Sequence, residues 1–325
     1  MKKLLIIKPS SLGDIIHGLV AAQSIREQMP GCSMSWVVEE RFAPVVRGCP
    51  TVDQSIVFER YGGLRRFFRL IKTIRREQYD CVLDFQGLAR SAIMALLARA
   101  HTRLGRTDAR EGAGWAYQQK APLPPGAAPA HAIEILLQFL PLLGLEAKPD
   151  STIHLAGAPL SPPHDQLAGL RPIVLLPNSR VPKKEWEGFT ELTRLILLRH
   201  PGLTVVWSSH QARPTPEDLA AQPRLRNLTG QTTLPQMIGI IQSARLAVAN
   251  DSGPMHIAAA VGTPVVACFG PTAPERFGPY PLNRPTHRVV RAPNGDLARL
   301  EVATVYEAVR DLLSSLPATP RNDER

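Results

Sequence analysis

Short apolar runs alternate with longer amphipathic segments along this chain, and no other feature restricts its possible folds as much. KLLIIK at residues 3–8 is a nearly continuous apolar run, which is typical of a strand buried on both faces of a sheet. Residues 14–28 follow, with apolar positions close to helical spacing. The alternation continues to about residue 143 and restarts at IVLLP, residues 173–177. This repeated order predicts an α/β fold with parallel sheets covered by helices on both faces.

Two such halves predict two domains with a cleft between them. The proline-rich stretch GAPLSPPH at 157–164 separates the halves, so we expect Rossmann-like domains at 1–157 and 165–325, each able to bury its own core. Strands are expected at 3–8, 34–39, 80–85, 173–177, 203–208, 245–249 and 264–269. Helices are expected at 14–28, 64–78, 88–100, 131–143, 188–199, 234–243, 254–261 and about 303–315. Ligands of open α/β sheets bind at the carboxyl ends of the strands, so chemistry is expected on the loops that follow strands.

The charge balance indicates acidic partners. The 325 residues include 38 Lys and Arg against 28 Asp and Glu, a formal net charge of +10. A basic protein of this kind binds nucleic acid, an anionic membrane face or a phosphorylated substrate, and composition alone does not choose among them. The sequence contains no run of about 18 apolar residues, so no membrane-spanning helix is expected.

The densest positive charge lies in residues 60–76, which hold seven basic residues and no acidic one. The basic residues are Arg60, Arg65, Arg66, Arg69, Lys72, Arg75 and Arg76. The helix expected at 64–78 has an apolar face made of Leu64, Phe67, Phe68, Ile71 and Ile74. Its basic residues are then either an ordinary solvated face or a surface attracted to an anionic membrane or an acidic acceptor. RNA binding lacks the support of interleaved stacking aromatics and of an RNA-binding module motif.

Several enzyme classes lack their motifs in this sequence. No GxGxxG follows the first strand and no GxxxxGK[ST] occurs, so the dehydrogenase and P-loop classes lack support. No Asp-x-Asp pair occurs either, and sugar transferases that hold their donor through a metal ion generally need one. A site for a diphosphate would then rely on positive side chains and helix N-termini instead of a metal.

Polar residues follow the predicted strands in both halves. In the first half the loop at 8–14 is rich in small residues, and Asp14 is either the N-cap of the next helix or a general base. In the second half the loops at 177–186, 250–256 and 269–272 each follow a strand and suit a phosphate group. Each of these loops alone is also compatible with an ordinary capped turn or a solvated loop.

At these residues the chain resembles glycosyltransferase family 9, the ADP-heptose heptosyltransferases. The resemblance covers nearly the whole chain and rests on several segments in order. They are KPSSLGDIIH (8–17), WVVEERF (36–42), LDFQGLARSA (83–92), KKEW (183–186), NDSGPMHIAAAVGTP (250–264) and FGPT (269–272). Within the family, the segments WVVEE and DFQGL are most similar to heptosyltransferase I.

The resemblance implies a GT-B fold, with the acceptor on the first domain and the nucleotide donor on the second. It implies inversion at the anomeric carbon in one displacement, with Asp14 as the general base and Lys184 at the donor diphosphate. The other implied donor residues are Asn178, Ser179, Asp251, Ser252, Gly253 and His256. The implied acceptor residues are Ser10, Ser11, Gly13, Arg60 and Gln86. The resemblance also leaves open that the C-terminal helix packs back on the first domain.

The implied reaction is transfer of L-glycero-D-manno-heptose from ADP-heptose to Kdo of the lipopolysaccharide inner core, with Kdo-lipid A as acceptor. No cofactor, no metal and no nucleic acid are expected. The protein is expected in the cytoplasm, peripherally on the anionic cytoplasmic face of the inner membrane. Three alternatives stay open: a family cousin that adds a later heptose or another sugar, an isomerase like the nucleotide-sugar 2-epimerases, and a non-catalytic binder of nucleotide or RNA.

Overall fold

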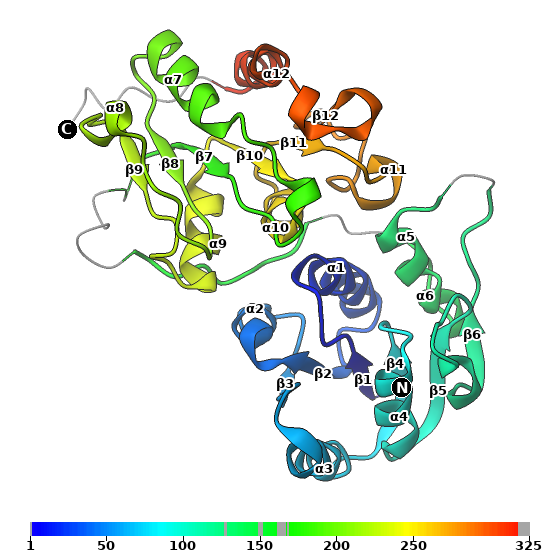
Figure 1. Ribbon diagram of the computed structural model, residues 1–325. Coiled ribbons are helices and arrows are strands. Elements are labelled where there is room, and N and C mark those ends of the chain that lie inside the picture. Colours follow the sequence, from blue (N-terminus) through cyan, green and yellow to red (C-terminus); the bar gives the residue numbers. More distant parts are fainter. Residues whose placement is uncertain (1, 127–128, 149–151, 161–166, 168, 318–325) are drawn as a thin grey trace. The chain divides into compact units, whose positions relative to one another are not determined.

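A computed structural model describes residues 2–126, 129–148, 152–160, 167 and 169–317 of this chain (Figure 1). The fold divides into two compact units, Met1–Ala156 and Gly157–Arg325. The boundary falls at the first residue of the proline-rich stretch 157–164, and residues 161–164 of that stretch lie outside the described part.

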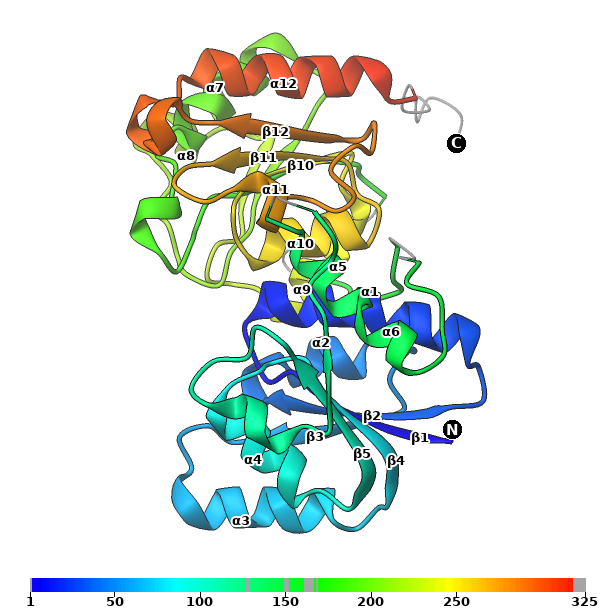
Figure 2. The same cartoon turned by 90° about the vertical axis from the view of Figure 1, so that its right-hand side faces the viewer.

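The first unit is a parallel sheet with the strand order β3-β2-β1-β4-β5-β6. Its strands are β1 (Lys3–Ile7), β2 (Ser33–Glu39), β3 (Gln54–Phe58), β4 (Tyr79–Asp84), β5 (Ala100–Arg106) and β6 (Gln119–Ala121). Its helices are α1 (Leu12–Gln28), α2 (Ala43–Arg47), α3 (Gly63–Ile74), α4 (Ala89–Leu97), α5 (Ala132–Leu137) and α6 (Phe139–Leu142). Figure 2 shows α1 and α2 on one face of the sheet and α3 and α4 on the other.

The second unit repeats this plan with the strand order β12-β11-β10-β7-β8-β9. Its strands are β7 (Ile173–Leu176), β8 (Val205–Trp207), β9 (Leu225–Asn227), β10 (Leu246–Asn250), β11 (Val265–Phe269) and β12 (His287–Arg291). Its helices are α7 (Phe189–Arg199), α8 (Glu217–Ala220), α9 (Leu234–Ser243), α10 (Gly253–Ala260), α11 (Pro274–Phe277) and α12 (Val302–Ser315). Helices α7 and α12 cover one face and α9 and α10 the other (Figure 2). The predicted fold class, α/β with parallel sheets covered on both faces, is therefore confirmed.

Several predicted helices differ from those in the structure, and the one predicted at 88–100 ends at Leu97, before β5 begins at Ala100. The helix predicted at 131–143 is broken into α5 and α6, because Pro141 lacks an N–H and its ring clashes with the carbonyl group four residues earlier, at the last residue of α5. The helix predicted at 64–78 ends at Ile74, since the chain must turn before β4 begins at Tyr79. The helix predicted from residue 14 begins at Leu12, which makes Asp14 its third residue and Ser11 its N-cap.

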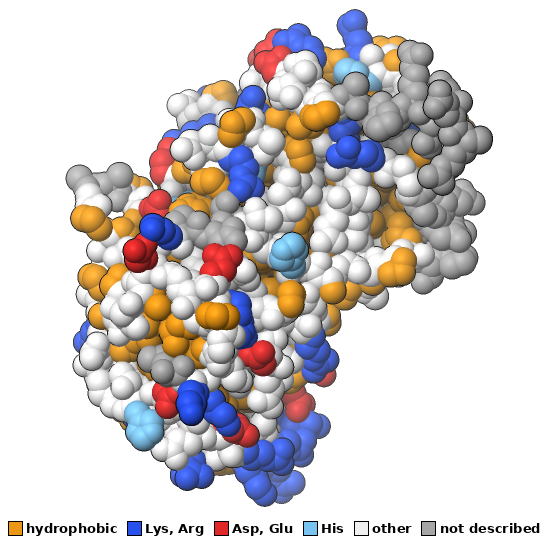
Figure 3. All heavy atoms as spheres, turned by 180° about the vertical axis from the view of Figure 1, so that it is seen from behind, with side chains coloured by type: hydrophobic (Ala, Val, Ile, Leu, Met, Phe, Trp, Pro, Cys, Tyr) orange, Lys and Arg blue, Asp and Glu red, His pale blue; other side chains and the backbone are white. Residues whose placement is uncertain are grey.

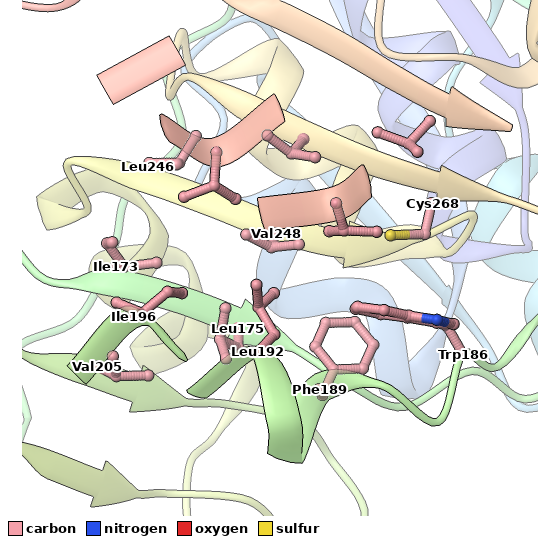
Figure 4. Close-up of a cluster of buried hydrophobic side chains, with 14 of the residues drawn as sticks. Ile173, Leu175, Trp186, Phe189, Leu192, Ile196, Val205, Leu246, Val248 and Cys268 are labelled. Atoms are coloured by element: carbon pink, nitrogen blue, oxygen red, sulfur yellow. The ribbon is translucent and has the colours of Figure 1, made fainter. Parts of the chain in front are cut away.

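Each sheet has a core on both faces, since alternate residues of the central strands point in opposite directions. In the first unit Leu5 and Ile7 of β1 belong to the buried cluster that includes Ile71 and Ile74 of α3. In the second unit strand residues share a buried cluster with α7 and with Trp186, which precedes this helix, and Trp186 and Phe189 pack edge to face with ring centroids 5.2 Å apart (Figure 4).

Helix α12 is part of the second core. Val305, Val309 and Leu312 are buried in the same cluster as β7 and β10 residues, and α12 contacts α7, β10, β11 and β12. The apolar face of this C-terminal helix is therefore buried on the sheet of its own unit. Packing on the first domain, which the sequence left open, is not needed to bury it.

Helix α3 uses only part of its predicted apolar face. Leu70, Ile71 and Ile74 are buried, and Phe67 is half-buried. Leu64 and Phe68, which the sequence also assigned to that face, are instead exposed to solvent. The helix therefore carries large apolar side chains that the core of its own unit does not cover.

The chain order reverses between β1 and β4 in the first sheet and between β7 and β10 in the second. Ligands of open α/β sheets bind beyond the carboxyl ends of the strands at such switch points. The loops after these four strands are where the sequence placed most of its candidate site residues. No helix among the described residues is long and apolar enough to cross a bilayer.

Candidate functional site

Lys8 lies on the loop between β1 and α1, and Asp14 lies in the first turn of α1. The Oδ2 atom of Asp14 accepts hydrogen bonds from the Ser11 N–H at 3.0 Å and from the Ser11 hydroxyl at 2.7 Å. The Lys8 ammonium lies 3.6 Å from Oδ1 of Asp14, and the Lys8 side chain is buried whereas that of Asp14 is 42% exposed. Asp14 therefore satisfies a free N–H group at the start of α1 and also presents a solvent-accessible carboxylate. The two roles that the sequence left open are compatible.

The surroundings of Asp14 keep it ionised. Burial by itself would raise the pKa of the carboxyl, but the Lys8 ammonium, His17 and the Ser11 hydrogen bonds outweigh it and hold the pKa well below its usual range. Burial lowers the pKa of the Lys8 ammonium, and the nearby Asp14 carboxylate opposes that effect. A carboxylate that is anionic at neutral pH is in the form that a general base requires.

Asp84, the last residue of β4, lies on the other side of this switch point and is fully buried. Its Oδ1 accepts hydrogen bonds from the N–H groups of Gln86 at 2.9 Å and Gly87 at 3.0 Å, and its Oδ2 accepts one from the Tyr117 hydroxyl at 2.7 Å. Gly87 has a φ of 68°, which glycine adopts at little steric cost. Burial raises the pKa of Asp84, and these hydrogen bonds oppose the rise. Asp84 thus fixes the turn that carries Gln86, whose Oε1 is buried without a hydrogen-bond partner among the described residues.

Glu39 joins the ends of β2 and β3 to the loop after β1. Its carboxylate is buried and forms ion pairs with Arg60 and Arg41, each at 2.8 Å. Its backbone N–H donates to the carbonyl oxygen of Pro9 at 3.1 Å. Arg60 is therefore held at the same edge of the sheet as the loop that leads from β1 to Asp14.

Three loops of the second unit meet at Asp251, which is buried directly after β10. Its Oδ2 accepts hydrogen bonds from the Lys184 ammonium at 2.5 Å and from the Thr272 hydroxyl at 2.6 Å. Lys184 comes from the loop after β7, and Thr272 from the loop after β11. A cation and a hydroxyl donor are thus collected at the carboxyl edge of the second sheet.

The loop after β7 is tied to the sheet by polar side chains. Asn250 donates from Nδ2 to the carbonyl oxygen of Pro177 at 2.7 Å, and its Oδ1 accepts from the Trp186 N–H at 3.0 Å. Glu185 accepts the Ser179 N–H at 2.9 Å through Oε2. These contacts fix both ends of the loop that carries Asn178 and Lys184.

Arg213 supports the same loop. Its guanidinium lies 3.4 Å from Glu185 and 3.3 Å from Glu187. The Glu185 side chain is mostly buried, whereas that of Glu187 is 84% exposed. Glu185 thus links a basic side chain to the backbone of the loop, while Glu187 does not.

Helix α10 begins at Gly253, with Ser252 as its N-cap and Pro254 in its first turn. Free N–H groups at such a terminus attract anions. The Ser252 Oγ and the Asn178 Oδ1 are buried without hydrogen-bond partners among the described residues. They follow the neighbouring strands β10 and β7, so two unsatisfied polar atoms lie on the loops that flank the second switch point.

The structure places the predicted site residues in two groups, one on each unit. Ser10, Ser11, Gly13, Asp14, Arg60 and Gln86 lie after β1, β3 and β4, and Asn178, Ser179, Lys184, Asp251, Ser252 and Gly253 lie after β7 and β10. His256 lies further along α10 and is buried. The sequence assigned no role to Lys8, Glu39, Asp84, Glu185, Asn250 or Thr272. The available signal was a polar residue at the end of an apolar run, as at Glu39, Asp84 and Asn250.

No three His, Cys, Asp or Glu side chains gather closely enough to hold a metal ion in the part of the chain that the structure describes. The groups that could bind an anionic ligand in the second unit are the Lys184 ammonium, the hydroxyls of Ser252 and Thr272, and the N-terminus of α10.

Comparison with known proteins gives matches that extend over both units. The model for glycosyltransferase family 9 (heptosyltransferase) matches residues 67–306. Lipopolysaccharide heptosyltransferase 1 of Escherichia coli strain K12 is 30% identical over 332 residues, covering 95% of this chain and 100% of that protein. The solved structure of E. coli heptosyltransferase WaaC with ADP has a TM-score of 0.78 at 25% identity, covering 95% of this chain and 99% of that one. WaaC with ADP-2-deoxy-2-fluoro heptose has a TM-score of 0.77 at the same identity and coverage.

Proposed function

This chain belongs to glycosyltransferase family 9, the heptosyltransferases, and from that premise we propose that it transfers L-glycero-D-manno-heptose from ADP-heptose to Kdo of the lipopolysaccharide inner core. The family resemblance and the GT-B fold predicted from the motifs are confirmed, and the chain is a glycosyltransferase. The ligands in the two WaaC structures support the donor, and the E. coli relative's name supports the step. One observation carries the chemistry: an ionised, accessible Asp14 carboxylate beside the buried Lys8 ammonium.

In the proposed reaction Asp14 accepts the proton of the acceptor hydroxyl while the hydroxyl oxygen attacks the anomeric carbon of the heptose. The bond from that carbon to the ADP oxygen breaks on the opposite side, so the configuration inverts in one displacement. Its electron pair leaves with ADP, and the proton ends on Asp14. The Ser11 hydrogen bonds restrain one carboxylate oxygen, so the proton is expected on the other, Oδ1.

The second unit is proposed to stabilise the negative charge that develops on ADP. Lys184, the Ser252 hydroxyl and the N–H groups at the start of α10 are suited to the diphosphate. Asp251 acts here as a positioning residue, because it holds Lys184 and Thr272 in place through Oδ2. These groups would do the work of a metal ion, so we propose metal-independent transfer.

The first unit is proposed to bind the anionic acceptor, Kdo-lipid A. Arg60 is fixed by Glu39 at the edge of the sheet that carries Asp14, where it can pair with a carboxylate or phosphate. Ser10, Gly13 and Gln86 lie on the adjacent loops and are proposed as further acceptor contacts. We propose that the protein reaches this acceptor at the cytoplasmic face of the inner membrane, as a peripheral protein.

The experiment that tests this function is ADP release from ADP-heptose, with and without Kdo-lipid A, for the wild type and for Asp14→Asn. We expect release that depends on the acceptor, with kcat lowered about 10²- to 10⁴-fold in Asp14→Asn because general base catalysis is lost. ADP binding should be unchanged in the variant. Asp311→Asn, which alters an exposed carboxylate on α12, serves as the control and should keep full activity.

Other outcomes would assign the reaction differently. Transfer only to an acceptor that already carries heptose would identify a later step of core assembly. Release of free nucleotide without any acceptor would indicate isomerase chemistry of the 2-epimerase kind. Full activity in Asp14→Asn would exclude Asp14 as the base.

A further inference from the structure

The exposed apolar side chains of α3 and of the turn before it form a surface that the fold of the first unit does not explain. Tyr61, Leu64 and Phe68 are 90%, 75% and 65% exposed. Leu64 and Phe68 are four residues apart, so they lie on one side of the helix, and Tyr61 precedes them by one turn. Large apolar side chains gathered on a protein surface mark an interaction site more often than scattered ones do.

A basic row runs beside these residues, along α3 and just past its end. Arg65, Arg69, Lys72 and Arg76 recur at spacings of four, three and four, so they form a neighbouring row. All are exposed, and within the described residues none of them forms an ion pair with a carboxylate. Figure 3 shows Lys and Arg side chains gathered where Figure 1 places α3.

Neighbouring cations of the chain are engaged, which makes this row distinctive. Arg60 pairs with Glu39, and Arg66 pairs with Glu59. The four cations of the basic row are therefore available to a partner outside the unit. An anionic partner that also accepts apolar side chains satisfies both features of the helix at once.

We propose that α3 docks on an anionic lipid bilayer, with Tyr61, Leu64 and Phe68 inserted at the headgroup boundary and the basic row of Arg65, Arg69, Lys72 and Arg76 on the lipid phosphates. This is the chemistry of interfacial amphipathic helices, which combine inserted aromatic and aliphatic residues with Lys and Arg. A nucleic-acid partner would use the charge but would not need the exposed apolar side chains, and a protein partner would have to supply an apolar surface beside an acidic row, whereas an anionic bilayer offers both along its whole face. The inference deepens the peripheral location proposed above and rests on it, yet binding to lipid is independent of sugar transfer.

The test is binding of the full-length protein to vesicles of phosphatidylcholine with about 30% phosphatidylglycerol, without donor or acceptor, at low and physiological salt. We expect the wild type to partition onto these vesicles and to bind vesicles of phosphatidylcholine alone at least about tenfold more weakly. The double variant Leu64→Ser/Phe68→Ser should lose at least about tenfold in partitioning onto the anionic vesicles. Leu198→Ser, at a residue of α7 that is 74% exposed, is the matched control and should bind like the wild type.

A second measurement reports insertion directly. The indole introduced by Phe68→Trp should be quenched by brominated lipid in the anionic vesicles, whereas the indole introduced by Leu198→Trp should not. Unchanged binding of Leu64→Ser/Phe68→Ser, together with no added quenching in Phe68→Trp, would overturn insertion and leave only a charged surface. Failure of the wild type to bind anionic vesicles would overturn the proposal outright, even where transfer to a soluble acceptor is intact.

Discussion

At the residue scale, the buried ammonium of Lys8 controls the ionisation of the Asp14 carboxyl. Lysine is almost never fully buried unless it is paired, and here its partner is a carboxylate that remains open to solvent. The cation stabilises the charged form of Asp14 against the effect of burial. An acceptor hydroxyl would therefore meet an anionic base over the whole neutral range of pH.

Lys8→Met tests this control of charge, since it keeps the apolar stem and removes the cation. The pKa of Asp14 should rise, because Lys8 is the first of the groups that lower it and burial remains. The basic form exists above the pKa and is lost as the pH falls through it, so the acid limb of kcat/KM should move to higher pH, by roughly 1–3 pH units. Rates of ADP release from neutral pH down to the lowest pH at which the protein stays folded provide the measurement, with Lys3→Met on the same strand as control. An acid limb at the wild-type position would show that Lys8 does not set the charge of Asp14.

Tyr117→Phe removes one of the donors to the buried carboxylate of Asp84. The carboxylate keeps the backbone N–H groups of Gln86 and Gly87 but loses a buried hydrogen bond, so the first unit should be destabilised by about 1–3 kcal/mol. Native-state hydrogen exchange of β4 amides gives the free energy of opening. Tyr61→Phe, at an exposed side chain, should change nothing. An equal loss in both variants would mean that the Asp84 bond contributes no stability.

The sequence predicted some residues of the candidate site and not others for a physical reason. Asp14 was identifiable because a carboxylate follows a small-residue loop at the start of a helix. Lys8 was visible in that loop, but the burial of its ammonium depends on tertiary packing. The link between Glu39 and Arg60 joins the ends of two neighbouring strands, and the sequence did not predict β3. Local patterns show which residue types follow a strand, but not which of them touch.

At the scale of elements, the sequence predicted the central strands and missed the edges. β1, β4, β7 and β10 are buried on both faces and therefore read as apolar runs. The strands at the sheet edges, β3, β6, β9 and β12, expose alternate or adjacent positions and contain polar residues. β5, next to an edge, has only two fully buried positions, and the sequence did not predict it. The sequence therefore predicted the central strands but not the full number of strands.

The loop between β7 and α7 depends on Glu185 for its shape, and Glu185→Gln tests this. The variant loses the charge that pairs with Arg213 and weakens the bond that Glu185 accepts from the Ser179 N–H. A looser loop should bind ADP about tenfold more weakly, because ordering it then costs free energy on binding. Titration calorimetry with ADP measures the change. Glu187→Gln alters the more exposed partner of Arg213 and should bind ADP normally, so an equal effect in both variants would contradict the role of Glu185.

At the scale of the whole molecule, one topology occurs twice with different chemistry at its switch points. The first unit has a carboxylate beside a buried lysine, and the second has a lysine, hydroxyls and a helix N-terminus, which we propose bind a diphosphate. The doubled strand–helix pattern made the two units predictable, since each needs its own apolar strands and amphipathic helices. The C-terminal helix was harder to place, because an amphipathic helix can pack on any sheet with an open face, and only the structure shows α12 in the second core.

Because each unit has a core of its own, a nucleotide that binds the second unit should protect that unit selectively. At an ADP concentration about 100 times its Kd, the second unit is stabilised by about 2.7 kcal/mol against unfolding, which corresponds to roughly 100-fold slower exchange of amides that open only on unfolding. Hydrogen exchange of the full chain should show this slowing in β7 and β10. Exchange in β1 and β4 should stay at the rate measured without ADP, since those strands belong to the other core. Equal protection of both sheets would mean that the two units unfold as one cooperative body, and protection of β1 and β4 alone would place the nucleotide on the first unit.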